Sequence, residues 1–364
     1  MKVNPAYQTK EELLALYNTP LVELMYQAAT IHREYHNPLE VQMSSLLSIK
    51  TGGCPEDCSY CPQAARYHTD VEAHKLLSVE TVIAQAKTAK ENGSSRLCMG
   101  AAWRNIRDNR DFDKVIEMVE AVNSLDMEVC CTLGMMTESQ AERLKNAGLY
   151  AYNHNLDTSE DYYDDIISTR EYQERLSTIQ NAKKAGISVC SGGIIGMGEK
   201  IEDRIGLLMS YLKMDTPPDS IPINALVPVA GTPMAENKPV EIWEMVRMIA
   251  TTRIVFPEAI VRLSAGRTSM SQEGQALCFM AGASSIFAGD KLLTTPNPEF
   301  NEDQELFDIL GLTPKKSFQD GERPVSLPDP INLEKRKKAA EREAELAAAR
   351  NENDFAPRKV VSTK

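Results

Sequence analysis

Short apolar runs rich in β-branched residues recur along the chain, and helical patterns separate them. Runs of this length and composition are typical of strands buried in a parallel sheet. We predict eight strands, at residues 44–51, 95–102, 127–134, 150–157, 188–195, 220–227, 259–266 and 284–289. Their alternation with helical segments indicates repeated βαβ units.

The segments between these runs carry signals that begin and end helices. Residues 78–93 open on Ser78, whose hydroxyl can accept a backbone hydrogen bond at a helix start, and close on a glycine. Residues 137–148 open on a Thr-x-x-Gln capping box. Residues 169–186 also end at a glycine. We predict a helix in each segment.

Eight strands that alternate with helices predict an α/β protein with a (β/α)8 barrel of the TIM type. An open doubly wound sheet is the alternative. We expect residues 1–42 to form a helical extension that covers one end of the barrel, and residues 43–320 to form the barrel. Residues 321–364 should be a charged, partly disordered tail, because residues 333–364 are rich in Ala, Glu, Lys and Arg and lack an apolar stripe.

Composition narrows the class of protein. The 364 residues are 42% hydrophobic and 25% charged, as in globular proteins, and the net charge of -12 disfavours a nucleic-acid binder. The N-terminus lacks the basic and apolar regions of a signal peptide, and no apolar run could cross a membrane. We therefore expect a cytoplasmic protein, whose eight cysteines are ligands, nucleophiles or buried apolar residues rather than disulfides.

Three cysteines lie close together after the first predicted strand. Cys54, Cys58 and Cys61 have the spacing Cys-x3-Cys-x2-Cys, and glycines and prolines shape the loop. In a barrel this loop would lie at the C-terminal face, where active sites form. Three thiolates leave one position of a four-ligand site open. A zinc ion completed by a distant residue and an iron–sulfur cluster with one free iron both remain open on spacing alone.

Polar side chains also occupy central positions of the predicted strands, where branched apolar residues normally fill a barrel. Alternation along a strand places Asn153, Asn155 and Asp157 on one face, which suits a hollow barrel with a polar ligand. An inward Arg262 would need an anionic partner, either a carboxylate or a negatively charged cluster. Three further cysteines could converge there: Cys98, Cys130 and Cys190. Cys131 has the opposite parity to Cys130, and Cys278 falls in a helical pattern, so we assign both to the core.

The Cys-x3-Cys-x2-Cys loop, with Tyr60 before its last cysteine, resembles that of radical S-adenosylmethionine (SAM) enzymes. Within that superfamily the chain resembles the biotin synthase family, in seven stretches between residues 40 and 315. These read GGCPEDCSYCPQA, MGAAWR, YNHNLDTS, VCSGGIIGMGE, PINALVPVAGTP, VRLSAGR and CFMAGASSIFAGDKLLTTPNP. The charged tail lies outside the resemblance.

The resemblance implies roles for particular residues. A 4Fe–4S cluster would be held by Cys54, Cys58 and Cys61, with S-adenosylmethionine on the open iron, and a 2Fe–2S cluster by Cys98, Cys130, Cys190 and Arg262. Contacts with S-adenosylmethionine would come from Tyr60, Asn155, Asp157, Arg175 and Ile194. Dethiobiotin would be held by Asn153, Asn224, Thr294 and Thr295.

The implied reaction is radical insertion of sulfur from the 2Fe–2S cluster into dethiobiotin, with no side chain as acid or base. Implied partners are an electron donor such as flavodoxin or ferredoxin, the iron–sulfur assembly machinery and a second copy of the chain. The alternatives are another radical SAM enzyme, such as a maturase or sulfur-inserting relative, and a non-catalytic iron–sulfur or zinc protein.

Overall fold

The computed structural model describes residues 1–327 and 329–354, which belong to two compact units, Met1–Ser326 and Leu327–Lys364. The second unit contains the helix α12 (Pro330–Asp354), which lies in the charged tail. The disordered end predicted for the tail falls in residues 355–364, outside the described residues. The division of the chain at residues 42/43 and 320/321 remains a prediction.

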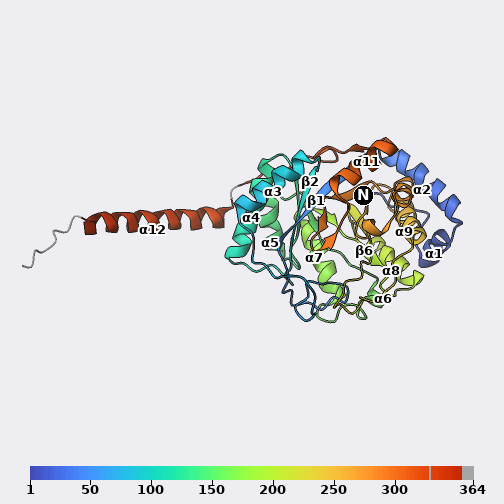
Figure 1. Cartoon of the computed structure of the whole chain (residues 1–364), viewed down its shortest axis with the longest axis horizontal. Coiled ribbons are helices and arrows are strands. Elements are labelled where there is room, and N and C mark those ends of the chain that lie inside the picture. Colours follow the sequence, from blue (N-terminus) through green and yellow to red (C-terminus); the bar gives the residue numbers. More distant parts are fainter. Residues whose placement is uncertain (328, 355–364) are drawn as a thin grey trace, which may run out of the picture. The chain divides into compact units, whose positions relative to one another are not determined.

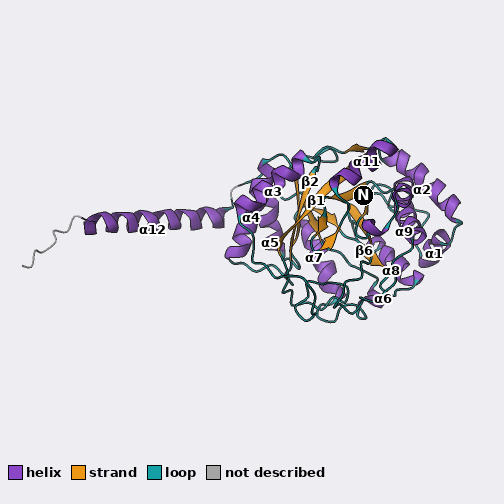
Figure 2. Ribbon diagram, viewed as in Figure 1, coloured by secondary structure: helices purple, strands orange, loops and turns teal. Residues whose placement is uncertain are grey.

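Parallel strands form the centre of the first unit, and helices surround them (Figures 1 and 2). The main sheet contains β1 (Glu40–Lys50), β2 (Arg96–Ala101), β3 (Glu128–Thr132), β4 (Ala151–Asn153), β5 (Ser188–Cys190), β6 (Gly193–Ile195), β7 (Ser220–Ala225), β8 (Ile260–Leu263), β9 (Ser285–Ala288) and β12 (Thr313–Pro314). A separate hairpin consists of β10 (Lys291–Leu292) and β11 (Thr295–Pro296).

The helices of this unit are α1 (Lys10–Tyr17), α2 (Leu21–Tyr35), α3 (Val79–Glu91), α4 (Arg110–Ser124), α5 (Glu138–Asn146), α6 (Glu160–Tyr163), α7 (Tyr172–Lys184), α8 (Ile201–Leu212), α9 (Ile242–Val255), α10 (Gln272–Met280) and α11 (Phe300–Leu310). A short 3-10 helix spans Arg267–Ser269.

The sheet closes into a barrel. Its strands follow the order β1-β2-β3-β4-β5-β7-β8-β9, and β9 pairs in parallel with β1, so that Gln42 lies opposite Ser285. The predicted (β/α)8 barrel is therefore confirmed, and the open doubly wound sheet is wrong.

The fifth predicted strand, 188–195, is two short strands in the structure. β5 and β6 are separated at Ser191–Gly192, and both pair with β7. A Cβ atom at Gly192 would lie 2.0 Å from the carbonyl oxygen of Pro222, so only glycine permits this close approach of the two chains.

The helix starts follow the local sequence. The Ser78 hydroxyl accepts a hydrogen bond from the Thr81 amide at 3.2 Å, as its position predicts. Thr137 and Gln140 form the predicted capping box with bonds of 3.4 and 3.0 Å. The helix predicted from residue 169 begins only at Tyr172, because the residues before it serve the site described below.

The N-terminal helices lie elsewhere than expected. α1 contacts α8 and α9, and α2 contacts α9 and α10, so both pack on the outer helices rather than across an end of the barrel (Figure 1). The segment after α11 instead passes the starts of the first three strands. Thr313 pairs with Glu40, the Ser317 hydroxyl donates to the Ser95 carbonyl, and the Phe318 amide donates to the Glu128 carboxylate.

The core lies between the barrel and the helices. Strand residues that face outward are fully buried in it, among them Val129, Cys131 and Tyr152. Inside the barrel, Cys98, Cys130 and Ala151 form a separate small cluster. The interior is therefore not filled by a continuous apolar core, and space remains for a site.

Candidate active site

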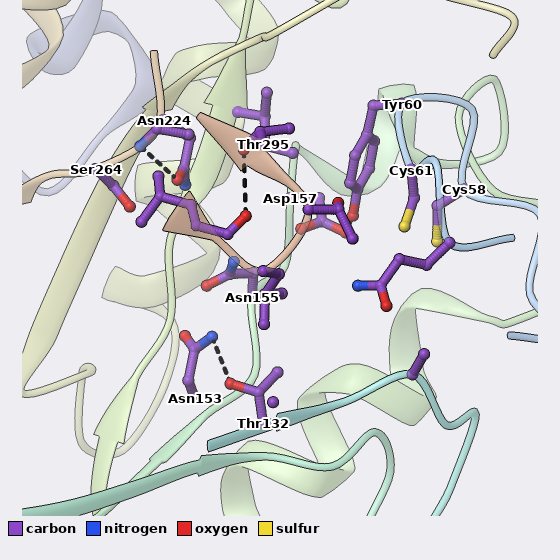
Figure 3. A pocket seen from close by; sticks show the side chains of 18 of the residues that line it. Cys58, Tyr60, Cys61, Thr132, Asn153, Asn155, Asp157, Asn224, Ser264 and Thr295 are labelled. Atoms are coloured by element: carbon purple, nitrogen blue, oxygen red, sulfur yellow. Dashed lines mark hydrogen bonds between the residues drawn. The ribbon is translucent and has the colours of Figure 1, made fainter. Parts of the chain in front are cut away.

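A cavity of about 340 Å³ lies inside the barrel and at its loops (Figure 3). Fourteen of the sixteen residues predicted for the site line it: Cys54, Cys58, Tyr60, Cys61, Cys98, Asn153, Asn155, Asp157, Arg175, Ile194, Asn224, Arg262, Thr294 and Thr295. The other two, Cys130 and Cys190, are buried close to Cys98. Residues from six strands and their loops thus meet at one place.

The cysteine loop, residues 52–65, follows β1 and turns at two glycines with positive φ, Gly52 (68°) and Gly53 (64°). A Cβ at Gly52 would lie 3.0 Å from the Cα of Ala73, so side chains are disfavoured there. The loop is held by its own backbone, because the Cys54 amide donates to the Gln63 carbonyl at 2.9 Å and the Cys61 amide donates to the Cys58 carbonyl at 2.9 Å.

The three thiols of this loop are free and face the cavity. Burial raises the pKa of Cys58 to about 11 and that of Cys61 to about 12, and it also raises the pKa of Cys54. Without a cation these groups are therefore neutral thiols. Binding of a metal cluster would have to displace their protons, as is usual for thiolate ligands.

Carboxylates beside Cys58 anchor the loop to residues 166–169. The Asp57 carboxylate accepts hydrogen bonds from the amides of Ser168 and Thr169, at 3.0 and 3.2 Å. Burial opposes its ionisation, but the hydrogen bonds from these two residues outweigh that effect and lower the pKa of Asp57 to about 2. Glu56 pairs with Arg104 at 2.6 Å and also accepts from the Thr169 hydroxyl.

A second network joins the loop to the fourth strand and α7. The Tyr60 hydroxyl donates to the Asp157 carboxylate at 2.7 Å, and Arg175 pairs with the same oxygen at 2.6 Å. Arg175 also donates to the Tyr163 hydroxyl at 2.7 Å and to the Asn155 carbonyl. Both charged partners are at least 95% buried, so the pair is stable only because every group is matched.

The interior cysteines, Cys98, Cys130 and Cys190, come from three strands. Cys98 lies directly opposite Cys130 in the β2–β3 register, and Cys190 lies opposite Asn153. A hydrogen bond with Cys130 and the nearby Arg262 guanidinium outweigh burial and lower the pKa of Cys98 to about 7. Cys98 and Cys190 are close enough for a charge on the Cys98 sulfur to raise the pKa of Cys190. Cys131 and Cys278 lie in the outer core, as their positions predict.

Arg262 reaches the same chamber from β8 and is only 1% exposed. Its guanidinium donates to the hydroxyl of Ser285 at 2.9 Å and to Gln42 and Ser44 at 3.3 Å, and it stacks 4.4 Å from the Phe287 ring. These partners are neutral. A buried cation with neutral partners needs an anion nearby, which suits a negatively charged ligand among the interior cysteines.

A second buried cation lies beside the interior cysteines. Arg96 pairs with Glu128 at 2.7 Å, and its guanidinium lies 5.2 Å from the centre of the Tyr150 ring. Gln42 donates to the same carboxylate at 3.2 Å. Unlike Arg262, Arg96 therefore has its counter-ion within the protein.

Amides and hydroxyls occupy the far wall of the cavity (Figure 3). Asn153 donates to the Thr132 hydroxyl at 3.1 Å, while its buried Oδ1 atom has no partner. Asn224 bridges the Gly193 carbonyl and the Ala265 amide. Since a buried acceptor without a partner is unfavourable, Asn153 Oδ1 indicates a ligand that donates a hydrogen bond.

In the part of the chain that the structure describes, no three His, Cys, Asp or Glu side chains are close enough together for a single metal ion. An iron–sulfur cluster does not require that arrangement, since its cysteines bind different iron atoms. No helix in residues 1–327 and 329–354 is long and apolar enough to span a membrane.

Comparison with known proteins places this site in a family. Residues 48–210 match the radical SAM superfamily, and residues 222–313 match the biotin and thiamin synthesis associated domain. The chain is 66% identical to the biotin synthase of Christiangramia forsetii over 319 residues, 88% of each chain. The chain belongs to the biotin synthase family. A mitochondrial biotin synthase of Arabidopsis thaliana is 57% identical over 84% of this chain and 82% of its own length.

Solved structures outside the biotin synthase family share its fold. Methylornithine synthase has a TM-score of 0.72 with 20% identity, and the match covers 86% of this chain and 95% of that one. The FeFe-hydrogenase maturase of Carboxydothermus hydrogenoformans has a TM-score of 0.72 with 18% identity, and the match covers 84% of this chain and 76% of that one. These likenesses concern the barrel alone.

Sequence reasoning missed residues that support the site. Glu56 and Asp57 lie inside the quoted cysteine motif, but their partners Ser168 and Thr169 are more than 100 positions away in the sequence. Gln42, Ser44 and Ser285, which hold Arg262, lie on the first and last strands. Ser44 could have been found by the same alternation along the strand that places other polar residues inside the barrel.

Proposed function

We propose that the chain forms biotin by inserting sulfur into dethiobiotin, with S-adenosylmethionine as cosubstrate. The observation that carries the proposal is that a first set of thiols, the three of the cysteine loop, lines one cavity together with Cys98, beside which the rest of a second set, Cys130 and Cys190, is buried. A relative that only cleaves S-adenosylmethionine needs the first set alone. The second set supplies a place for the sulfur source.

The cysteine loop would hold the 4Fe–4S cluster through Cys54, Cys58 and Cys61. This assignment is supported by three free thiols on a loop with little freedom to move, at the edge of the cavity. The loop offers three sulfur ligands, which leaves an iron atom for the amino and carboxylate groups of S-adenosylmethionine.

The interior would hold the 2Fe–2S cluster through Cys98, Cys130, Cys190 and Arg262. The burial of all four, and the neutral partners of Arg262, support an anionic group at this place. Arg96, by contrast, has the Glu128 carboxylate as its counter-ion and does not need an anionic ligand.

S-adenosylmethionine would lie between the cysteine loop and the fourth strand, against Tyr60, Asn155, Asp157, Arg175 and Ile194. Asp157 suits the ribose hydroxyls because a carboxylate can accept from both. Its bonds to Tyr60 and Arg175 fix its orientation before the ligand arrives.

Dethiobiotin would lie deeper, against Asn153, Asn224, Thr294 and Thr295. The free acceptor of Asn153 suits a ureido N–H, and the threonine hydroxyls on the β10–β11 hairpin suit a carboxylate.

When bound, the two clusters and S-adenosylmethionine supply removal of hydrogen from unactivated carbon and the sulfur that replaces it. The chain's own residues hold the reacting carbon between the two thiol sets and exclude water with the closed barrel wall. No side chain acts as acid or base, because no group in a protein can deprotonate an unactivated C–H bond at neutral pH.

An anaerobic assay with dethiobiotin, S-adenosylmethionine and a reductant tests the proposal. We expect biotin and 5′-deoxyadenosine, from protein whose absorption and Mössbauer spectra reveal two cluster types. Deoxyadenosine without biotin, from protein with a single cluster, would indicate another radical SAM activity. Zinc without acid-labile sulfide would indicate a non-catalytic protein.

The family resemblance also supports a flavodoxin or ferredoxin as electron donor, repair by the iron–sulfur assembly machinery, and a homodimer. The cytoplasmic location expected from the sequence remains a prediction. Reduction by purified flavodoxin, sedimentation analysis and cell fractionation test these points in turn.

A further inference from the structure

Asp57 lies next to the cluster cysteine Cys58 but faces away from any ligand role, because protein donors saturate its carboxylate. Oδ1 accepts from the Ser168 amide, the Thr169 amide and the Thr169 hydroxyl, at 3.0, 3.2 and 2.9 Å. Oδ2 accepts from the Ser168 hydroxyl and, at 3.0 Å, from Arg66. The side chain is only 6% exposed. The Thr169 hydroxyl shares its single proton between Asp57 and Glu56, and the other four donors on this buried carboxylate make a strong and directional anchor.

The anchor holds both neighbours of Cys58. On one side, the Asp57 amide donates to the Thr169 hydroxyl at 3.1 Å. On the other side, the amide and hydroxyl of Ser59 both donate to the Ile166 carbonyl, at 3.0 and 2.9 Å. Residues 166–169, which lie more than 100 positions further along the chain, therefore hold the residues on both sides of Cys58.

The same segment leads directly to the proposed cosubstrate site. Residues 166–169 lie between Tyr163 and α7, and Arg175 of α7 bonds to Tyr163 and to Asp157. Asp157 in turn accepts from Tyr60, on the cysteine loop. The contacts form a closed ring, with the Asp57 anchor at one side and the Tyr60–Asp157 bond at the other.

We propose that Asp57 is a positioning residue, which fixes the cysteine loop against residues 166–169 so that the Cys58 sulfur and the Arg175–Asp157 pair keep their spacing. This inference rests on the proposed function, because it assigns the cluster to Cys58 and S-adenosylmethionine to Arg175 and Asp157. Asp57 itself touches neither. Without the anchor the three cysteines remain, but the distance between the cluster site and the cosubstrate site is no longer fixed.

Two variants weaken the anchor without removing a cysteine. Asp57→Asn keeps the shape of the side chain and one acceptor oxygen. An NH2 group that replaces Oδ2 would face the Arg66 guanidinium, so that two hydrogen-bond donors would meet. Thr169→Val keeps the volume and removes the hydroxyl that bonds to both Asp57 and Glu56. Asp113→Asn is the matched control, because Asp113 is 8% exposed and pairs with Arg143 on the outer helices.

Each protein is reconstituted anaerobically, and iron, sulfide, thermal stability and the EPR spectrum of the reduced 4Fe–4S cluster are measured with and without S-adenosylmethionine. For Asp57→Asn and Thr169→Val we expect a full 4Fe–4S content, a smaller spectral change on adding S-adenosylmethionine, and a KM for it raised about tenfold, which equals ~1.4 kcal/mol. The ratio of deoxyadenosine to biotin among the products should rise. Asp113→Asn should lower thermal stability and leave the KM and the spectrum unchanged.

The inference is overturned if both anchor variants keep the wild-type KM, spectrum and product ratio. It is also overturned if both lose the 4Fe–4S cluster, because the anchor would then be needed only to fold the loop. If the wild type cleaves S-adenosylmethionine but makes no biotin, the proposed function fails, while the KM and the spectrum still test Asp57.

Discussion

The hydroxyl of Tyr60 donates to the carboxylate of Asp157 at 2.7 Å, although the two residues are 97 positions apart. The bond joins the cysteine loop to the fourth strand at the place assigned to S-adenosylmethionine. Removing the hydroxyl in Tyr60→Phe deletes one charge-assisted hydrogen bond and leaves the Arg175–Asp157 pair intact. We expect weaker binding of S-adenosylmethionine by about 1–2 kcal/mol, measured by equilibrium dialysis, with the iron content unchanged. An unchanged affinity for S-adenosylmethionine would mean that the Tyr60–Asp157 bond does not contribute to its binding.

Asp157→Asn should have a larger effect. Arg175 is 4% exposed, and loss of the carboxylate leaves its charge buried without a counter-ion. Breaking a buried ion pair from one side costs about 3–5 kcal/mol. We expect a lower midpoint in urea for the cluster-free protein and no detectable cleavage of S-adenosylmethionine. A midpoint equal to that of the wild type would mean that Arg175 finds another partner.

Cys190→Ala should separate the two thiol sets. The cysteine loop is untouched, so the variant should still cleave S-adenosylmethionine, while the 2Fe–2S absorption and biotin formation are lost. Arg262→Ala is expected to alter the same absorption, because its guanidinium lies among the interior cysteines. Biotin formation at the wild-type rate by Cys190→Ala would exclude the interior cysteines as the place of the sulfur source.

The free acceptor of Asn153 predicts a contact with the substrate. Asn153→Ala removes the Oδ1 atom that has no protein partner. We expect the KM for dethiobiotin to rise about tenfold, since one hydrogen bond to a buried group contributes about 1 kcal/mol or more. The KM for S-adenosylmethionine should stay within twofold of the wild-type value. If only the KM for S-adenosylmethionine changed, Asn153 would belong to the cosubstrate site instead.

Two histidines near Arg253, the buried His32 and the half-buried His36, predict sensitivity to acid. Burial lowers the pKa of His32 to about 3 and that of His36 to about 4, from a usual value near 6.5. The folded chain therefore keeps both neutral, whereas the unfolded chain takes up protons below pH 6.5. The charged groups that act on them are Arg33, Arg253, Lys315 and Asp320.

The free energy of unfolding should therefore fall as the pH drops from 6.5 toward 4, by at most about 1.4 kcal/mol per pH unit for each histidine. Urea unfolding at several pH values measures the slope. Replacing both histidines by glutamine should reduce the slope, to which the buried His154 also contributes, whereas His74→Gln should not change it, because His74 is exposed. Equal slopes for the wild type and the double variant would contradict the prediction.

Local patterns predicted the barrel, the cysteine loop and the inward polar positions of the strands, because these depend on neighbours in the sequence, whereas the contacts with cosubstrate and substrate came from the family resemblance and remain predictions. Strand alternation separated Cys130 from Cys131, and cap residues such as Ser78 marked helix starts. The break between β5 and β6 depends on how closely Gly192 approaches Pro222, and the role of Asp57 depends on partners near residue 168. Neither contact has a local signature, so both required the structure.

The first and last barrel strands meet at Gln42 and Ser285, and Arg262 donates hydrogen bonds to both sides of that seam. During biosynthesis, a ribosome that has released the chain only as far as β8 has already produced every cysteine of both sets. The chamber around Arg262 still lacks a wall at that stage. The proposed interior site is therefore complete only once β9 has been translated and has paired with β1.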